Sequence, residues 1–276
     1  MTTNKIFSRP NRTINILTTC SGIGAPEMAL RRLGLKSRIL LACDYDKNCE
    51  KEYKLNYKPE HWVKNMYDVD AAPFKGQISL LVAGICCQTF SMAGNRTLTE
   101  EDGTGRGGLF LPMVKMINDG QPDVFIMENV KGMIMRKDGE PSAWESTIYP
   151  ALLSTGYDIH YAILNAKDYG VPTDRPRLFV VGFREPRPDF EFPRPIQLTH
   201  CLEDYLDDEV PEEYKVNDTV SYLTPRECLR IMGFPEDFKI SPEVSGDEII
   251  HQCGNSIVVD VLMEIYKQFD ITRYGK

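Results

Sequence analysis

Two adjacent cysteines, Cys86 and Cys87, carry the clearest chemistry in the sequence. They lie in residues 82–91 (VAGICCQTFS), after a short apolar run that ends at a glycine. Such a run predicts a buried strand whose carboxyl end delivers the cysteines to a loop, where parallel α/β sheets present reactive groups. A lone cysteine is most often a small buried apolar residue. Polar Gln88 and Ser91 indicate an exposed loop, so a thiolate nucleophile is the favoured interpretation.

A glycine-containing turn near the start of the chain indicates a nucleotide-type pocket. We expect a strand over residues 14–18, a turn over residues 20–25 (CSGIGA) and an amphipathic helix over residues 26–33. Glycines in such a turn let the backbone approach a ligand at the N-terminus of the helix. The turn carries no phosphate-binding lysine signature, which favours a nucleoside cofactor over a nucleoside triphosphate.

Asp44 strengthens this interpretation. It follows a second apolar run, residues 38–43, and lies 22 residues beyond Gly22. Nucleotide-binding folds place an acid near this spacing to accept hydrogen bonds from ribose hydroxyls. The alternative is that Asp44 ends a strand in solvent or caps a helix expected over residues 46–56.

Glu128 is the candidate acid of the site. It follows a predicted strand over residues 123–127 and begins the sequence Glu128-Asn129-Val130. Parallel strands present their carboxyl ends at one edge of a sheet, so Glu128 is expected to face the cysteines. Partial burial there raises the pKa of a carboxyl and suits it to donate a proton. The alternative is a capping role in a loop.

Arg175 and Arg177 occupy alternate positions in residues 170–177 (GVPTDRPR), between strands expected over residues 157–165 and 177–183. Alternate residues of a strand point the same way, and two guanidinium groups suit an anionic or carbonyl-bearing ligand. Exposed arginines are otherwise unremarkable.

Four more helices are expected, over residues 108–118, 142–154, 223–238 and 256–269. The third has a capping sequence and a Gly-Phe-Pro stop, and the last is apolar. At 276 residues, the chain can bury one substantial core with a small appended lobe.

The composition favours a cytoplasmic protein without a metal. No apolar run reaches about eighteen residues, the length that spans a bilayer, and the first residues lack the apolar core of a signal peptide. Eight cysteines at scattered spacings, without a CxxC, and four histidines make a zinc site or a disulfide framework unexpected.

The negative charge is concentrated in one segment. The formal net charge is −8, and residues 185–222 contain eleven acidic residues against three basic ones. The rest of the chain is therefore close to neutral. Overall acidity does not exclude nucleic acid as a partner, but it makes any binding cleft local.

Taken in order, SGIGA, Asp44, CCQTFS, ENV, VPTDRPR, LTPRECLRIMGFPEDF and QCGNS resemble the motif series of the cytosine-5 DNA methyltransferases, over residues 14–269. The resemblance implies a Rossmann-like α/β sheet that binds S-adenosylmethionine, with a very small second lobe. It also implies methyl transfer to C5 of a flipped cytosine in DNA through a covalent cysteine adduct.

The resemblance also assigns roles to residues. Cys87 matches the nucleophile that attacks C6, and Glu128 matches the acid that bonds N3 and the exocyclic amine. Arg175 and Arg177 match the arginines that hold the base and support the cysteine loop. The implied cofactor contacts are Cys20, Ser21, Gly22, Ile23, Gly24, Asp44, Tyr45 (against the adenine), Asn65, Gly84, Asn255 and Ser256. The implied substrate contacts are Cys86, Gln88, Ser91 and Asn129.

The sequence departs from the family pattern at several positions. Cys86 stands where the family has proline, and Thr173 replaces a glutamine. Thr18 and Cys20 stand where an acid and an aromatic residue are usual. These changes leave a modified sulfonium donor open as an alternative to S-adenosylmethionine.

The region that reads the target sequence is much reduced. Only about forty residues separate the arginine motif from Leu223. We expect a catalytic domain over residues 1–184, a reduced recognition lobe over 185–247, and a C-terminal helix over 248–276 that returns to the catalytic domain. The expected enzyme is of phage or bacterial type, with short or relaxed specificity, unless a partner chain supplies target recognition.

Two other functions remain open. The tRNA-modifying branch of RNA cytosine-5 methyltransferases shares most of these motifs. A regulatory homologue that binds a partner chain without catalysis is also conceivable, although Cys87, Glu128 and both arginines are retained.

Overall fold

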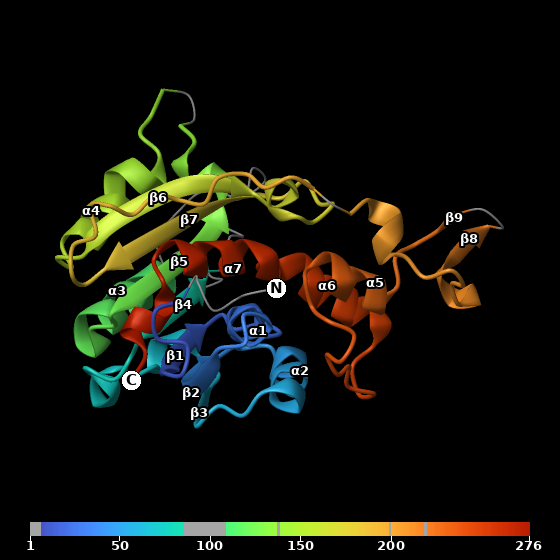
Figure 1. Cartoon of the computed structure of the whole chain (residues 1–276), viewed down its shortest axis with the longest axis horizontal. Coiled ribbons are helices and arrows are strands. Elements are labelled where there is room, and N and C mark those ends of the chain that lie inside the picture. The colour runs from blue at the N-terminus through green and yellow to red at the C-terminus, as the bar shows by residue number, and fades with distance from the viewer. Residues whose placement is uncertain (1–6, 86–108, 137–138, 199, 218–219) are drawn as a thin grey trace.

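The computed structural model describes residues 7–85, 109–136, 139–198, 200–217 and 220–276. The main sheet has seven strands, which are β1 (Thr13–Thr19), β2 (Lys36–Cys43), β3 (His61–Val63), β4 (Leu80–Gly84), β5 (Val124–Val130), β6 (Asp158–Asn165) and β7 (Pro176–Phe183). The helices are α1 (Ala25–Arg32), α2 (Lys47–Asn56), α3 (Phe110–Gly120), α4 (Tyr149–Leu153), α5 (Pro225–Ile231), α6 (Gly246–Asn255) and α7 (Val259–Gln268). Figure 1 shows their arrangement.

The strand order is β3-β2-β1-β4-β5-β7-β6, and this mixed sheet confirms the predicted α/β class. Strands β1 to β5 pair in parallel, whereas β7 is antiparallel to both β5 and β6. The carboxyl ends of the parallel strands therefore meet at one edge. Because β7 runs the other way, it begins at that edge, with Arg177 opposite Val130.

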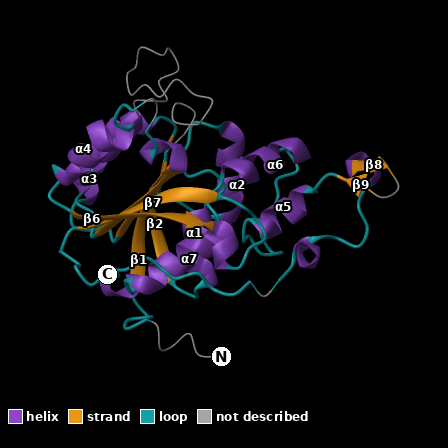
Figure 2. Cartoon of the chain, turned by 90° about the horizontal axis from the view of Figure 1, so that it is seen from above, coloured by secondary structure: helices purple, strands orange, loops and turns teal. Residues whose placement is uncertain are grey.

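Alternate residues of the central strands pack on opposite faces of the sheet. On one face Ile16 and Ile126 join an apolar cluster that includes α1 and α7, and on the other Leu17 and Phe125 join a cluster that includes α3. Figure 2 shows helices on both sides of the sheet. This two-sided burial is what near-continuous apolar strands require.

Most predicted elements lie within a few residues of the observed ones. Strand β5 is longer than expected and continues through Glu128 to Val130, so Glu128 is held within the sheet and not in a loop. The helix expected over residues 142–154 consists of a π-helical turn, Trp144–Ile148, that continues as α4. Strand β3 and helix α6 were not anticipated.

Residues 185–247 include both an outlying part and a part that joins the main core. A hairpin of β8 (Lys215–Asn217) and β9 (Val220–Ser221) lies at the end of the molecule away from β6 (Figures 1 and 2). In contrast, Leu229 of α5 and the nearby Phe234 belong to the same apolar cluster as α1. The division into three domains stays a prediction.

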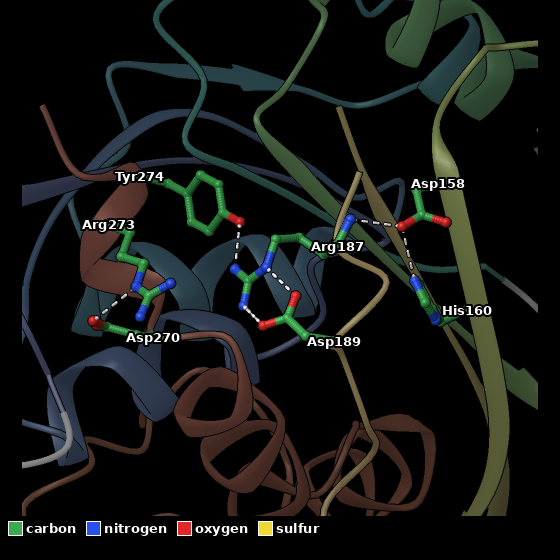
Figure 3. A network of polar contacts seen from close by, with 7 residues as sticks. All are labelled: Asp158, His160, Arg187, Asp189, Asp270, Arg273 and Tyr274. Atoms are coloured by element: carbon green, nitrogen blue, oxygen red, sulfur yellow. Dashed lines mark hydrogen bonds and ion pairs between the residues drawn. The ribbon is translucent and has the colours of Figure 1, made fainter. Parts of the chain in front are cut away.

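A polar network ties the β6–β7 pair to the C-terminal turn (Figure 3). The backbone N–H of Arg187, just after β7, donates to Asp158 Oδ2 at 2.7 Å, and His160 Nε2 lies 3.1 Å from the same oxygen. The Arg187 guanidinium contacts the Tyr274 hydroxyl at 3.1 Å and Asp189 at 3.0 Å. The network fixes the antiparallel strands at the end of the sheet opposite the arginine motif.

No helix in the described ranges is long and apolar enough to cross a membrane.

The close approach of β7 to β5 predicts a severe effect of Gly182→Ala. A Cβ at Gly182 would lie 2.1 Å from the buried ring of Phe125, its partner across the strands. Overpacking of this kind costs about 1–3 kcal/mol or more of the free energy of unfolding, which thermal or urea denaturation measures. Gly254→Ala is the control, because nothing lies within 4 Å of that position in helix α6. Equal stability of the two variants would contradict the close packing.

Candidate active site

A cavity of about 560 Å³ lies at the carboxyl edge of β1, β2, β4 and β5. Its volume suits a small organic ligand. The predicted cofactor residues that line it are Cys20, Ser21, Gly22, Asp44, Tyr45, Asn65, Gly84, Asn255 and Ser256. The predicted catalytic residues that line it are Glu128, Arg175 and Arg177. One cavity therefore contains both sets of side chains.

The first turn and Asp44 are joined by a direct hydrogen bond. Gly22, with a φ of 51°, donates its N–H to Asp44 Oδ2 at 2.8 Å, and Asp46 donates its N–H to Oδ1 at 3.0 Å. A carboxylate has about four acceptor positions, so Asp44 can accept further bonds from ribose hydroxyls. The helix cap is Asp46, whose side chain accepts from the Asn48 N–H at 2.7 Å, so the alternative capping role for Asp44 is wrong.

Ile23 and Gly24 are not among the residues that line the cavity. Ile23 is buried in the core. Gly24 has a φ of 82°, and a Cβ there would lie 2.3 Å from the ring of Tyr57, whose hydroxyl donates to the Gly24 carbonyl at 2.9 Å. Glycine at this position is therefore explained by packing between α1 and Tyr57.

Tyr45 and Asn65 line the cavity from the β2 and β3 side. Tyr45 is 70% exposed, and a tyrosine ring is a side chain that can stack against another ring system. Asn65 caps the short 3₁₀ turn Met66–Asp68, since its Oδ1 accepts from the Tyr67 N–H at 3.1 Å. Among the described residues, no hydrogen bond involves the amide nitrogen of Asn65.

Glu128 and Arg177 form an ion pair inside the cavity. Arg177 Nε lies 3.2 Å from Glu128 Oε1, and the Glu128 side chain is buried. Burial raises the pKa of Glu128, although the positive charges of Arg177 and Arg175 oppose this shift. Arg175 donates to the carbonyl of Ser256 at 2.8 Å, which ties the start of β7 to the end of α6. Burial and the two arginines therefore shift the pKa of Glu128 in opposite directions, and the effect of burial is the larger.

Asn129 does not line the cavity. Its side chain is fully buried, with Nδ2 donating to the carbonyl of Ile85 at 3.2 Å and Oδ1 accepting from the Val130 N–H at 2.8 Å. The contact holds the residue that directly precedes the cysteine pair. The predicted site residues Cys86, Cys87, Gln88 and Ser91 lie outside the described residues.

Gln252 of the QCGNS motif is a cavity residue that was not among the cofactor contacts expected from the sequence. It is 97% buried, and neither of its amide atoms has a hydrogen-bond partner among the described residues. A buried amide of this kind fits a polar ligand, because an unpaired amide costs about 1–3 kcal/mol. The signal was present in the QCGNS motif, but nothing in the sequence distinguished Gln252 from its neighbours.

Within the described ranges, no cluster of His, Cys, Asp and Glu side chains could hold a metal ion.

The sheet and its cavity define an α/β methyltransferase fold. The model for C-5 cytosine-specific DNA methylase matches residues 14–222 and 218–270. The chain therefore belongs to this family of DNA (cytosine-5) methyltransferases, which use S-adenosylmethionine, as the motif series predicted.

Individual proteins that resemble this chain agree with the assignment. Type II methyltransferase M.Bsp6I of Bacillus sp. (strain RFL6) is 28% identical over 313 aligned residues, which cover 91% of this chain and 97% of that protein. Type II methyltransferase M.HhaI of Haemophilus parahaemolyticus is 26% identical and covers 89% of this chain and 90% of its own length. The crystal structure of S. pombe Dnmt2 methyltransferase has a TM-score of 0.75 at 20% identity, covers 93% of this chain and 98% of that one, and shows the shared fold.

The Asn129 contact predicts a variant that affects catalysis more than cofactor binding. Asn129→Ala removes the donor that holds the Ile85 carbonyl. We expect turnover to fall about tenfold or more, while the affinity for S-adenosylmethionine stays within about threefold. Val124→Ala, at the far end of the same buried strand, is the control for lost stability. Equal turnover of the two variants at equal melting temperature would show that Asn129 has only a packing role.

Proposed function

We propose that the chain methylates C5 of a cytosine flipped out of duplex DNA, with Cys87 as the nucleophile and S-adenosylmethionine bound in the cavity. One observation carries this proposal: the hydrogen-bonded Gly22 and Asp44 line the same cavity as the Glu128–Arg177 ion pair. The Gly22–Asp44 side of the cavity suits a nucleoside, and the Glu128–Arg177 pair suits a base with an exocyclic amine.

The donor set of the cavity fits S-adenosylmethionine. Asp44 would accept from the ribose hydroxyls, Tyr45 would stack on the adenine, and Asn65 and Gln252 would meet polar groups of the cofactor. The unpaired buried amide of Gln252 supports this fit. When bound, the cofactor supplies an electrophilic methyl group.

The Cys87 thiolate adds to C6 of the flipped cytosine and moves an electron pair toward C5, which is otherwise a poor nucleophile. Glu128 donates a proton or a strong hydrogen bond at N3, help that is worth about 10² to 10⁴-fold in rate. C5 would take the methyl group as the bond from that methyl to the donor sulfur breaks. C5 then loses its proton to a base, the bond between the cysteine sulfur and C6 breaks to release the thiolate, and N3 returns its proton to Glu128. Flipping the base out of the stack costs a few kcal/mol.

The reduced recognition region supports short or relaxed specificity. The alignment with M.Bsp6I spans 313 residues against a chain of 276, so that relative has segments opposite gaps in this chain. The two segments matched by the family model overlap at residues 218–222, which include strand β9 of the hairpin. Sequence is read by side chains that reach base edges, and an acidic segment repels phosphates. A target of about two to four base pairs, or nearest-neighbour preference alone, follows unless a partner chain supplies recognition.

Nucleoside mass spectrometry of plasmid DNA treated with the purified chain and S-adenosylmethionine tests the activity. We expect 5-methylcytosine in DNA and much less in tRNA treated in parallel. A different mass would identify a modified donor, and methylation of tRNA alone would indicate an RNA enzyme. Bisulfite sequencing of the same plasmid should reveal a short target, and a single fixed site of five or more base pairs would contradict the proposal.

The Gln-Thr-Phe-Ser sequence that follows Cys87 predicts which cysteine reacts. Neighbouring residues of an extended segment point apart, so we do not expect Cys86 to replace Cys87 as the nucleophile. Cys87→Ser should abolish the covalent adduct with DNA that contains 5-fluorocytosine, whereas Cys86→Ser and Cys86→Pro should retain it. A gel that shows the reverse pattern would assign the nucleophile to Cys86.

The raised pKa of Glu128 predicts a pH dependence. The protonated form declines as the pH rises through this pKa, so turnover should fall on the alkaline side. Glu128→Gln should bind the cofactor normally, lose about 10²-fold or more in turnover, and lose this alkaline limb. Glu145→Gln, whose carboxylate is exposed and paired with Arg136, is the control. An unchanged turnover rate in Glu128→Gln would show that Glu128 does not donate a proton and only pairs with Arg177.

A further inference from the structure

A buried carboxyl lies behind the glycine turn of the cavity. Glu27, in the first turn of α1, is 1% exposed and does not itself line the cavity. Burying a carboxyl costs several kcal/mol unless hydrogen bonds compensate. Burial raises the pKa of Glu27, which reflects this cost.

Two hydroxyl groups converge on one oxygen of Glu27. Thr18 donates to Glu27 Oε1 at 2.9 Å, and Tyr53 donates to the same oxygen at 2.6 Å. Thr18 is near the end of β1 and lines the cavity, whereas Tyr53 is on α2 and is fully buried. Glu27 thus connects the first strand and two helices.

The chain of hydrogen bonds continues from Thr18 to the cavity wall. Thr18 Oγ1 lies 2.8 Å from Ser21 Oγ, and Ser21 Oγ accepts from the Cys43 N–H at 3.0 Å. Ser21 also donates its own N–H to the Cys43 carbonyl at 3.0 Å. Ser21 precedes Gly22 and Cys43 precedes Asp44, so this double contact sets the distance across which Gly22 and Asp44 bond.

The direction of each hydrogen bond follows from its two ends. Thr18 has one hydroxyl proton and donates it to Glu27 Oε1, so Ser21 must supply the proton of the Thr18–Ser21 contact while its oxygen accepts from the Cys43 N–H. Thr18, having accepted from Ser21, gives its proton to Glu27. This series of hydrogen bonds ends at Glu27 Oε1. Without an acceptor at that position, the Thr18 hydroxyl would have no partner on α1 to which it could donate its proton.

We propose that Glu27 is a positioning residue for the cofactor site, which holds the Ser21–Gly22 turn against Asp44 through Thr18. It supplies, from helix α1, the carboxyl that β1 lacks at its own carboxyl end, where the residues are Thr18 and Thr19. This role rests on the proposed placement of S-adenosylmethionine in the cavity.

Tyr53 offers a matched control. Its hydroxyl bonds the same carboxyl oxygen, but its ring is held separately, with ring centroids 4.9 Å from Tyr57 and 5.2 Å from Trp62. Tyr53→Phe therefore removes one donor to Glu27 and leaves the Thr18–Ser21 branch in place. Any loss common to Tyr53→Phe and Glu27→Met measures stability alone.

Calorimetric binding of S-adenosylmethionine, together with melting temperatures, tests the role without an activity assay. We expect Glu27→Met and Thr18→Val to raise Kd about tenfold or more. Glu27→Gln, which keeps an oxygen acceptor, should stay within about threefold of the unaltered protein, and so should Tyr53→Phe, even where its melting temperature falls. If Glu27→Met does not fold, Thr18→Val against Tyr53→Phe makes the same comparison.

Two results would overturn the role of Glu27. One is a loss of affinity in Glu27→Met or Thr18→Val no larger than that of Tyr53→Phe, and the other is a loss in Glu27→Gln as large as in Glu27→Met. Asp44→Ala separates this failure from failure of the cofactor site. If binding weakens in Asp44→Ala but not in the Glu27 variants, the proposed cofactor site stands and the role of Glu27 is wrong. If binding is unchanged in Asp44→Ala, both proposals are wrong.

Discussion

The ion pair between Glu128 and Arg177 depends on the reversed direction of β7, and the rest of the site depends on that reversal. A strand parallel to β5 would begin at the opposite edge of the sheet and carry the arginine motif away from Glu128. Because β7 is antiparallel, its first residues meet the last residues of β5. Arg177 then lies 3.2 Å from Glu128, and Arg175 reaches the carbonyl of Ser256. The last motif of the chain is thereby attached to the same edge as the first.

The sequence predicted the positions of most site residues because strand ends are easily recognised. Apolar runs that stop at Gly84, Asp44 and Glu128 indicated three parallel strands, and their carboxyl ends meet as expected. The nucleoside interpretation of Asp44 rested on its spacing from Gly22, and these two residues are bonded directly. The family assignment needed only the order of the motifs.

Individual side-chain contacts could not be predicted in the same way. The sequence does not reveal that Gly24 is required by the ring of Tyr57, that Asn129 turns toward Ile85, or that the amide of Gln252 lacks a partner in the described structure. Each depends on how two elements distant in the chain pack together. The buried Glu27 is a further case, because its Tyr53 partner lies 26 residues away on another helix. A periodic pattern predicts that a residue is inside but not what it bonds there.

The position of α7 has a consequence for the order of folding during synthesis. This helix packs against α1, the first helix of the chain, and the preceding residues 251–252 and 254–257 form part of the cavity wall. Domains generally fold as units while the ribosome extends the chain, but contacts between distant segments form only when both exist. The apolar face of α1 therefore remains uncovered by α7 until residues 259–268 have emerged from the ribosome. A nascent chain that already contains Cys86, Cys87 and Glu128 still lacks one wall of the cavity until residues 251–252 and 254–257 have been synthesised.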